Sequence, residues 1–308
     1  MNVFGNQLKL PTSSLAELGC LFRREQSSYS YKRTSTHEHW GTSLSIHWRH
    51  KICEWCYDFI DHYTFDREVV GVAMYYFDCY ISKQTSYEET HTKDQFQTIA
   101  VTSLFLAIKL HSMSEDCLAE NRANALSRLL CDNVDPKVIY EIERDILHKL
   151  NWRLNPPTLH QFALYFSRLH PLGECCATTT CYLYEATRYQ VELAIFSLEL
   201  LETFSSPVIA FAALQNAEEK IAADNPHILN ANVEQYFESL LGDQALLDTT
   251  DVRRCQASLR RLCPQLPELS DFGDADENAN SRVVTPHDYS AQEYTSAASF
   301  SPINVAGN

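Results

Sequence analysis

The sequence predicts an all-α protein with two helical lobes. Apolar residues recur at helical spacing along most of the 308 residues, and two successive sets of about five such segments meet at Pro156 and Pro157. No segment shows the alternation of apolar and polar residues that is typical of strands, and glycine is scarce, with 8 residues. These observations favour packed helices over a β architecture.

The first set of predicted helices precedes the two prolines. Residues 1–40 are rich in Ser, Tyr and His, and we expect a flexible segment there with one short helical candidate at 13–24. Asp135 and Pro136 suit the N-cap and the first position of the last helix of this set. The predicted helices span residues 42–63, 66–82, 94–111, 118–130 and 136–150.

The second set follows the two prolines and is itself followed by an acidic tail. Its predicted helices span residues 158–169, 176–189, 190–204, 206–221, 233–241 and 248–262. The tail is rich in Pro, Ser, Thr and acidic residues and poor in apolar ones, so we expect disorder there. The expected organisation is a flexible segment, two lobes and a disordered tail: 1–40, 41–155, 156–263 and 264–308.

Composition excludes several classes of function. With 25 basic and 40 acidic residues the net charge is −15, which disfavours binding to nucleic acid and to anionic membrane surfaces. No apolar run is long enough to span a bilayer. The odd number of cysteines, 11, and the absence of an apolar signal core predict a reduced, intracellular protein.

Two charged residues stand out on otherwise apolar helices. Lys109 lies near the end of the apolar stretch AVTSLFLAIKL, either as a lysine at the solvated edge of a buried helix or as part of a site. Glu143 falls inside the apolar arc of its helix, where a carboxylate is costly unless it is paired. It either forms an internal salt bridge or faces a surface that a partner covers.

The first lobe opens with a helix that carries two tryptophans. Trp48, Ile52 and Trp55 share one face, and Asp58 lies one turn beyond Trp55. Such a face is either core or the floor of a peptide groove with an acidic group at its edge. Cys53 and Cys56 form a CxxC pair, but no second pair follows at zinc-site spacing, so we expect buried thiols and no metal.

The chain shows no motif of a catalytic site. Phosphate-binding glycine loops, nucleophile elbows and zinc-protease or calcium-loop motifs are all absent, so we expect no enzyme activity and no cofactor. Thr285 and Ser301 each precede a proline in the tail. They are either candidate phosphorylation sites for proline-directed kinases or chance pairs in a Ser/Thr-rich segment.

Several of these segments, in this order, resemble the cyclin family over residues 42–263. YFDCYIS resembles the family's second helix, FQTIAVTSLFLAIKL its buried third helix, and IERDILHKLNWRLNPPT its fifth helix with the linker that follows. FSSPVIAFAALQNA resembles a helix of the family's second box. The resemblance implies two tandem five-helix cyclin boxes.

The resemblance also assigns roles to individual residues. Lys109 and Glu143 match the pair that holds a cyclin-dependent kinase near its mobile αC helix and activation loop. The family's substrate-docking groove falls on Trp48, Ile52, Trp55, Asp58 and Gln97. Lys51 stands at an apolar position of that groove, so we expect altered docking of basic peptides.

The resulting functional expectation is a non-catalytic regulatory subunit that binds and activates a cyclin-dependent kinase and controls cell-cycle progression. Its expected partners are the kinase and docking-motif substrates or inhibitors. Nucleus and cytoplasm are the expected locations. The alternative is a cyclin-fold scaffold or transcription-associated protein that binds peptides without activating a kinase.

Overall fold

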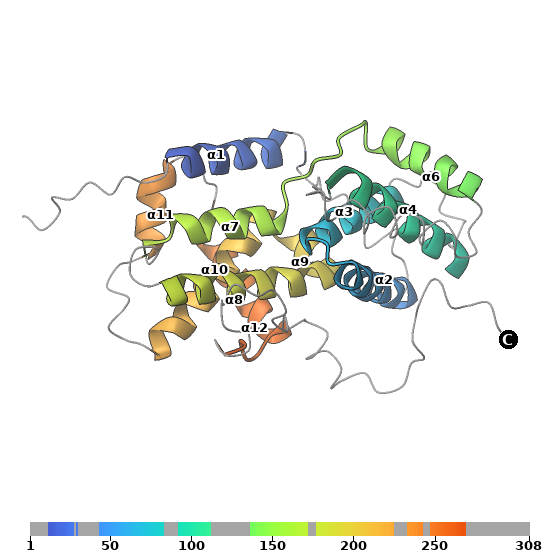
Figure 1. Cartoon of the computed structure of the whole chain (residues 1–308). Helices are drawn as coiled ribbons and strands as arrows, with labels where there is room; N and C mark the ends of the chain where they lie inside the picture. Colours follow the sequence, from blue (N-terminus) through green and yellow to red (C-terminus); the bar gives the residue numbers. More distant parts are fainter. Residues whose placement is uncertain are drawn as a thin grey trace, which may run out of the picture. The chain divides into compact units, whose positions relative to one another are not determined.

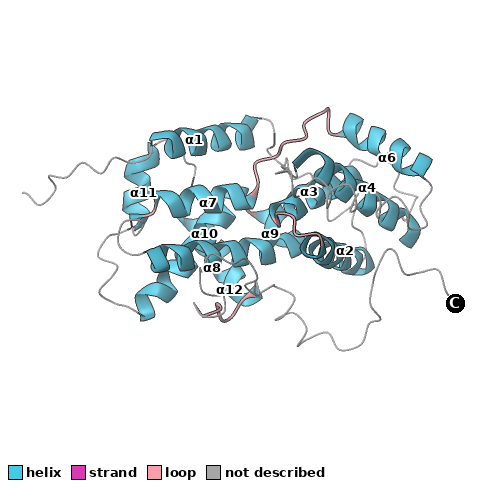
Figure 2. Cartoon of the chain, in the orientation of Figure 1, coloured by secondary structure: helices cyan, strands magenta, loops and turns pink. Residues whose placement is uncertain are grey.

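A computed structural model of the chain describes residues 12–27, 29, 43–82, 92–111, 136–171, 177–224, 233–242 and 247–268. The secondary structure of this part is helical throughout, with connecting loops and turns (Figure 2). The predicted all-α class is confirmed. The predicted helix at 118–130 and the tail beyond 268 lie outside the described residues.

The described helices, labelled in Figure 1, group into two compact units. The N-terminal unit comprises Tyr31–Thr158 and Ile195–Glu202, and the C-terminal unit comprises Met1–Ser30, Leu159–Ala194 and Thr203–Pro286. The chain passes between units after Thr158, close to Pro156 and Pro157. The assignment of residues 195–202 to the N-terminal unit was not anticipated from the sequence.

The N-terminal unit is built around helix α4, which spans Lys93–His111. Residues 99–108 of this helix are all buried, as the nearly all-apolar sequence predicts. Helix α4 packs against the three other long helices of the unit. These are α2 (Ser43–His62), α3 (Glu68–Ser82) and α6 (Pro136–Lys149).

A buried arginine ties residues 195 and 196 into this unit. Arg49 of α2 donates from Nε and Nη2 to the carboxylate of Asp78 in α3, at 2.9 and 2.8 Å. Its Nη1 donates to the carbonyl oxygens of Ile195 and Phe196, at 2.9 and 3.0 Å. Both charged side chains are almost fully buried, so these bonds supply the partners that the pair would otherwise find in water.

The C-terminal unit is built around helix α10, which packs against α7 and α12. An aromatic cluster fills its centre, because Phe166 lies within 6.2 Å, centroid to centroid, of the rings of Phe162, Phe211 and Phe237. The helices counted wholly in this unit are α1 (Thr12–Ser27), α7 (Leu159–Leu169), α10 (Ser206–Asp224), α11 (Val233–Leu241) and α12 (Thr249–Leu262).

Helix α1 corrects the expectation of a flexible segment over residues 1–40. The short helical candidate at 13–24 is part of this longer helix, which packs on α7. Phe22 is buried, and its ring lies 5.4 Å from that of Phe162. The backbone N–H of Ser206, at the start of α10, donates to Glu25 at 3.3 Å. Helix α1 is therefore ordered because its apolar face packs on α7 and completes the core of this unit.

The boundary predicted between residues 189 and 190 is also wrong. Helix α8 runs without a break through Ala177–Phe196, and the short helix α9 follows at Leu198–Thr203. The break falls at Ser197, whose hydroxyl accepts a hydrogen bond from the backbone N–H of Leu200 at 3.3 Å. Residues 189 and 190 are Tyr and Gln, which do not interrupt a helix.

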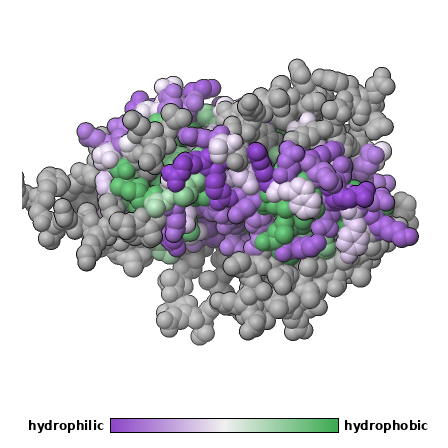
Figure 3. Space-filling model, turned by 90° about the horizontal axis from the view of Figure 1, so that it is seen from above, coloured by the Kyte–Doolittle hydropathy of each residue, from purple (hydrophilic) through white to green (hydrophobic). Residues whose placement is uncertain are grey.

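On the face shown in Figure 3, the described surface is largely hydrophilic. Figure 3 shows one face of the molecule, on which smaller hydrophobic areas lie among hydrophilic side chains. Within the described ranges, no helix combines the length and the apolar character needed to cross a membrane.

Candidate partner-binding surface

The structure brings together Lys109 of α4 and Glu143 of α6. Lys109 Nζ donates to Glu143 Oε1 at 2.9 Å. The two side chains differ sharply in exposure: that of Lys109 is 46% exposed and that of Glu143 is 10% exposed. The expectation that Glu143 lies on the apolar side of its helix is therefore correct, and its internal ion-pair partner is Lys109.

Helix geometry explains why this carboxylate is placed there. Ile139, Glu143, Ile146 and Leu150 recur at intervals of three and four residues, so they share the side of α6 that packs on α4. Ile139, Ile146 and Leu150 are buried. Glu143 lies at the edge of this stripe, where Lys109 provides the charged partner that a carboxylate on an apolar face requires.

The same edge of α6 continues as an apolar surface. Tyr140 and Leu147 flank Glu143 three residues before and four residues after it, so all three share a face. Tyr140 is 54% exposed and Leu147 is half-buried. On α4, Lys109 Nζ lies 5.5 Å from the ring centroid of Phe105. We call Lys109, Tyr140, Glu143 and Leu147 the α4–α6 surface.

Sequence reasoning missed Tyr140, and it also missed Trp152 in the turn after α6. Trp152 is 64% exposed. The signal for Tyr140 was available, because it lies one turn before the anomalous Glu143. Periodicity carried no signal for Trp152, since that residue lies beyond the end of the helix.

The predicted docking-groove residues are mostly core. Ile52 is fully buried, and Trp55 and Gln97 are nearly so, which matches the core alternative for this face. Solvent reaches Asp58 and part of Trp48, whose ring lies 5.4 Å from Lys93 Nζ. The groove assignment stays a prediction.

Two features bear on what that groove would accept. Lys51 Nζ donates to Glu54 at 2.8 Å, so the lysine that was expected to repel basic peptides has an acidic neighbour on its own helix. The Nε2 of Gln97 is buried and has no hydrogen-bond partner among the described residues.

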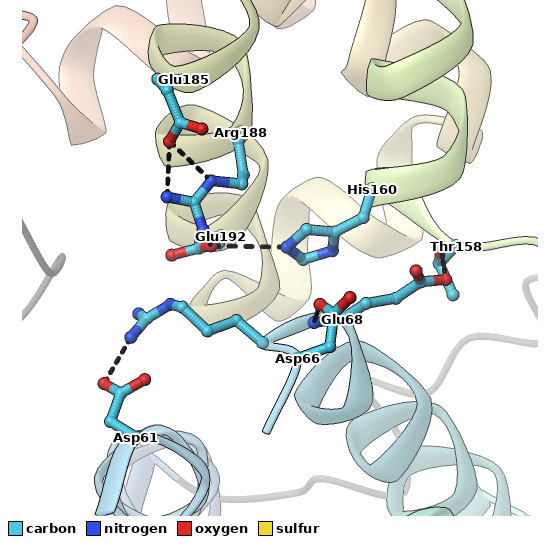
Figure 4. Close-up of polar contacts among 9 residues, drawn as sticks. Asp61, Asp66, Glu68, Thr158, His160, Glu185, Arg188 and Glu192 are labelled. Carbon is cyan, nitrogen blue, oxygen red and sulfur yellow. Dashed lines mark hydrogen bonds and ion pairs between the residues drawn. The ribbon is translucent and has the colours of Figure 1, made fainter. Parts of the chain in front are cut away.

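The polar contacts of Figure 4 that belong to the N-terminal unit lie at the start of α3 and tie the linker to it. Asp66 accepts a hydrogen bond from the backbone N–H of Glu68 at 2.9 Å, as an N-cap does. Thr158 donates from its hydroxyl to Glu68 at 2.6 Å, and Arg67 pairs with Asp61. These contacts are structural.

The other contacts of Figure 4 belong to the C-terminal unit. His160 of α7 faces Glu192 of α8, with 3.5 Å between Nε2 and Oε1. Arg188 contacts both Glu192 and Glu185. Burial works to lower the pKa of Arg188, but the two carboxylates outweigh it and raise that pKa above its usual range. The arginine therefore stays charged and neutralises the buried Glu192.

The other candidates from the sequence are the CxxC cysteines, a metal site and the two residues that precede prolines in the tail. Burial raises the pKa of both Cys53 and Cys56, which keeps these thiols protonated and unreactive. Over the described residues, no three His, Cys, Asp or Glu side chains are grouped as metal ligands. Thr285 and Ser301 lie outside the described residues and stay predictions.

The first half of the chain matches a known family of domains. Residues 20–155 match the family model described as "Cyclin, N-terminal domain". Two curated relatives are Cyclin-O protein B and Cyclin-O protein A of Xenopus laevis, with 31% and 30% identity over 176 residues. The aligned region covers 56% of this chain and 46% of each relative, so the chain spans about half the length of these relatives.

The fold of a larger part of the chain matches a solved structure. A viral cyclin from herpesvirus saimiri aligns with a TM-score of 0.53 over 81% of this chain and 96% of the viral chain. At 18% identity this likeness establishes the fold alone. Fold and domain match together define a cyclin-fold protein. The domain match over residues 20–155 and the likeness of fold support a divergent member of the cyclin family.

Proposed function

We propose that this chain is the regulatory, non-catalytic subunit of a cyclin-dependent protein kinase. It binds the kinase through the α4–α6 surface and shifts it toward its active conformation. The alternative, a cyclin-fold scaffold or transcription-associated protein, would bind its partner without this activation.

The Lys109–Glu143 pair carries this proposal. A half-exposed ammonium and a nearly buried carboxylate lie 2.9 Å apart, with the exposed ring of Tyr140 nearby on the same face as Glu143. An ammonium has three donor hydrogens and a carboxylate has two acceptor oxygens, so each can also bond to the backbone of a partner. Charge-assisted bonds of this kind fix the orientation of an interface.

The apolar members of the surface supply the area that binding requires. Tyr140 and Leu147 extend the contact along about 10 Å of α6, which is two helical turns. A surface of this length fits one face of an amphipathic helix in the partner. In the proposed complex that helix is the kinase's mobile αC helix. Binding stabilises the αC position of the active kinase, and activation is this shift in population.

The proposal is tested by measuring the affinity of the purified chain for a panel of purified cyclin-dependent kinases by calorimetric titration. Lys109→Ala and Glu143→Ala are each expected to weaken binding by at least about tenfold, because each leaves the other charge unpaired at the interface. Circular dichroism confirms that both variants keep the helical fold.

Lys220→Ala is the matched control. Lys220 also forms lysine–carboxylate pairs, with Asp224 and Glu268, but it lies on α10 in the C-terminal unit. Its removal is expected to leave kinase affinity unchanged. Equal affinity for the wild type and all three variants, or no binding to any kinase of the panel, would contradict the proposed function.

A further inference from the structure

Helix α12 concentrates positive charge on a strongly acidic chain. Its 14 residues include four arginines and a single acidic residue, Asp251, whereas the whole chain has a net charge of −15. All four arginines are exposed: Arg253, Arg254, Arg260 and Arg261. The helix therefore presents a positive surface that attracts acidic segments.

Helical periodicity gathers this charge on the outer side of α12. The inner side, which packs on α10, consists of buried residues at intervals of one, three and four positions: Val252, Cys255, Gln256 and Leu259. Arg253 and Arg261 lie on the opposite side, because the eight residues between them make little more than two turns. We call the four arginines of this helix the α12 basic face.

Two members of the α12 basic face have no acidic partner within the described part of the chain. Arg254 pairs with Asp251 at 3.1 Å. Arg261 instead donates to the hydroxyl of Ser258 at 2.9 Å, and neither it nor Arg253 forms an ion pair with a described carboxylate. An exposed guanidinium presents a fork of donors that matches the two oxygens of a carboxylate.

The chain that follows α12 turns back toward this helix. Glu268, the last described residue, pairs with Lys220 of α10 at 3.1 Å. Glu219, the sequence neighbour of Lys220, pairs with Arg260 of the α12 basic face. The described chain therefore ends next to a residue that contacts this face.

The segment that comes next carries the opposite charge. Residues 269–280 read LSDFGDADENAN, with four acidic residues and no basic one. Nine extended residues, 269–277, reach about 30 Å. Arg253 and Arg261 are eight residues apart on a helix, which is about 12 Å. The segment is long enough to run along the whole face from its attachment at Glu268.

We propose that the acidic segment 269–280 docks on the α12 basic face of its own chain. Its carboxylates supply Arg253 and Arg261 with the acidic partners that the described residues do not provide. Single exposed ion pairs are weak, but attachment at Glu268 gives the segment an effective concentration on the order of millimolar. The docked segment covers the positive face and competes with any other acidic chain for it.

The test uses a fluorescent peptide of residues 269–280, whose binding to the full-length chain is followed by fluorescence anisotropy. The wild type is compared with a neutral-tail variant, in which the segment's own carboxylates are removed by Asp271→Asn, Asp274→Asn, Asp276→Asn and Glu277→Gln. We expect the neutral-tail variant to bind the peptide at least about tenfold more tightly, because in the wild type the attached segment competes for the face.

Two further variants, built on the neutral-tail variant, locate the binding surface. Arg253→Gln/Arg261→Gln is expected to weaken peptide binding by at least about tenfold. Arg144→Gln/Arg168→Gln is the matched control, since it removes two exposed arginines from α6 and α7 and changes the net charge equally. This control is expected to keep the affinity of the neutral-tail variant. Circular dichroism confirms that each variant keeps its helical fold.

Each other outcome overturns the proposal in its own way. Equal peptide affinity of the wild type and the neutral-tail variant would show that the attached segment does not occupy the face, which would then be open to a separate acidic chain. Equal affinity of the two double-glutamine variants would show that net charge, and not α12, attracts the peptide. No peptide binding to any variant would exclude the contact. No kinase is present, so these results are independent of the proposed function.

Discussion

Arg49 and Asp78 are both almost fully buried, and each supplies the charged hydrogen-bonding partner of the other. Removing one partner leaves an uncompensated charge in the core. We expect Arg49→Ala to lower the free energy of unfolding by about 3–5 kcal/mol, measured by urea denaturation. Arg254→Ala breaks an exposed pair with Asp251 and is expected to cost less than about 1 kcal/mol. If the two variants lose the same free energy of unfolding, the buried pair contributes no more to stability than an exposed pair does.

His50 gives the N-terminal unit a pH dependence that can be measured. Its ring packs on Phe196 at 4.9 Å, and burial lowers its pKa from the usual 6.5. In the unfolded chain His50 therefore takes up a proton near pH 6.5, whereas in the folded chain it does so only at lower pH. Between the lowered pKa of the folded chain and 6.5, the unfolded state binds more protons than the folded state. The free energy of unfolding therefore rises with pH across this range, and this stability is lost as the pH falls below about 6.5.

The measurement compares unfolding at pH 7.5 and pH 5.5 in the wild type and in His50→Gln. We expect the wild type to lose more stability over this range than the variant does, because glutamine cannot take up the proton. All other side chains are the same in the two proteins, so the comparison isolates the contribution of His50. The same loss in both proteins would show that His50 does not contribute.

At the scale of helices, α1 is a structural part of the C-terminal unit. Phe22 is buried against Phe162 and Phe166 of α7. We expect Phe22→Ala to lower the free energy of unfolding by about 3–5 kcal/mol in a urea titration, because it leaves a cavity in an aromatic cluster. Gln26→Ala alters an exposed position on the same helix and is the control. A Phe22→Ala variant as stable as this control would show that α1 is dispensable.

The sequence predicted those helices whose limits carry a local signal. The prediction for residues 233–241 coincides with α11, and Asp248 caps α12 by accepting from the Thr250 N–H at 2.7 Å. The division within α8 was wrong because residues 189 and 190 contain no breaker. The packing of α1 was missed because its partner, α7, lies more than a hundred residues away in sequence, and periodicity does not report such contacts.

The candidate site was also predictable only where a local signal exists in the sequence. Glu143 was found because a carboxylate interrupts an apolar arc, which is a local signal. Its pairing with Lys109 came from the family resemblance, since α4 and α6 are separated in sequence. The left-handed backbone of Trp152 goes with the hydrogen bond from its N–H to the carbonyl of Leu147, which only the folded structure reveals.

At the scale of the whole molecule, the chain has a cyclin-like fold, and no three His, Cys, Asp or Glu side chains group as metal ligands among its described residues. Its distinctive surface features are an ion pair at the edge of an apolar helix face and an exposed tryptophan in the turn after that helix. Activation of a cyclin-dependent kinase through the α4–α6 surface is the central claim proposed for this chain.

The most direct test of that claim is the phosphorylation of a histone substrate by a purified cyclin-dependent kinase as this chain is titrated in. We predict that the rate rises to saturation with the wild type and stays near the level of the kinase alone with the folded Lys109→Ala/Glu143→Ala double variant. A rate that does not rise with the wild type, or that rises equally with the double variant, would contradict the account.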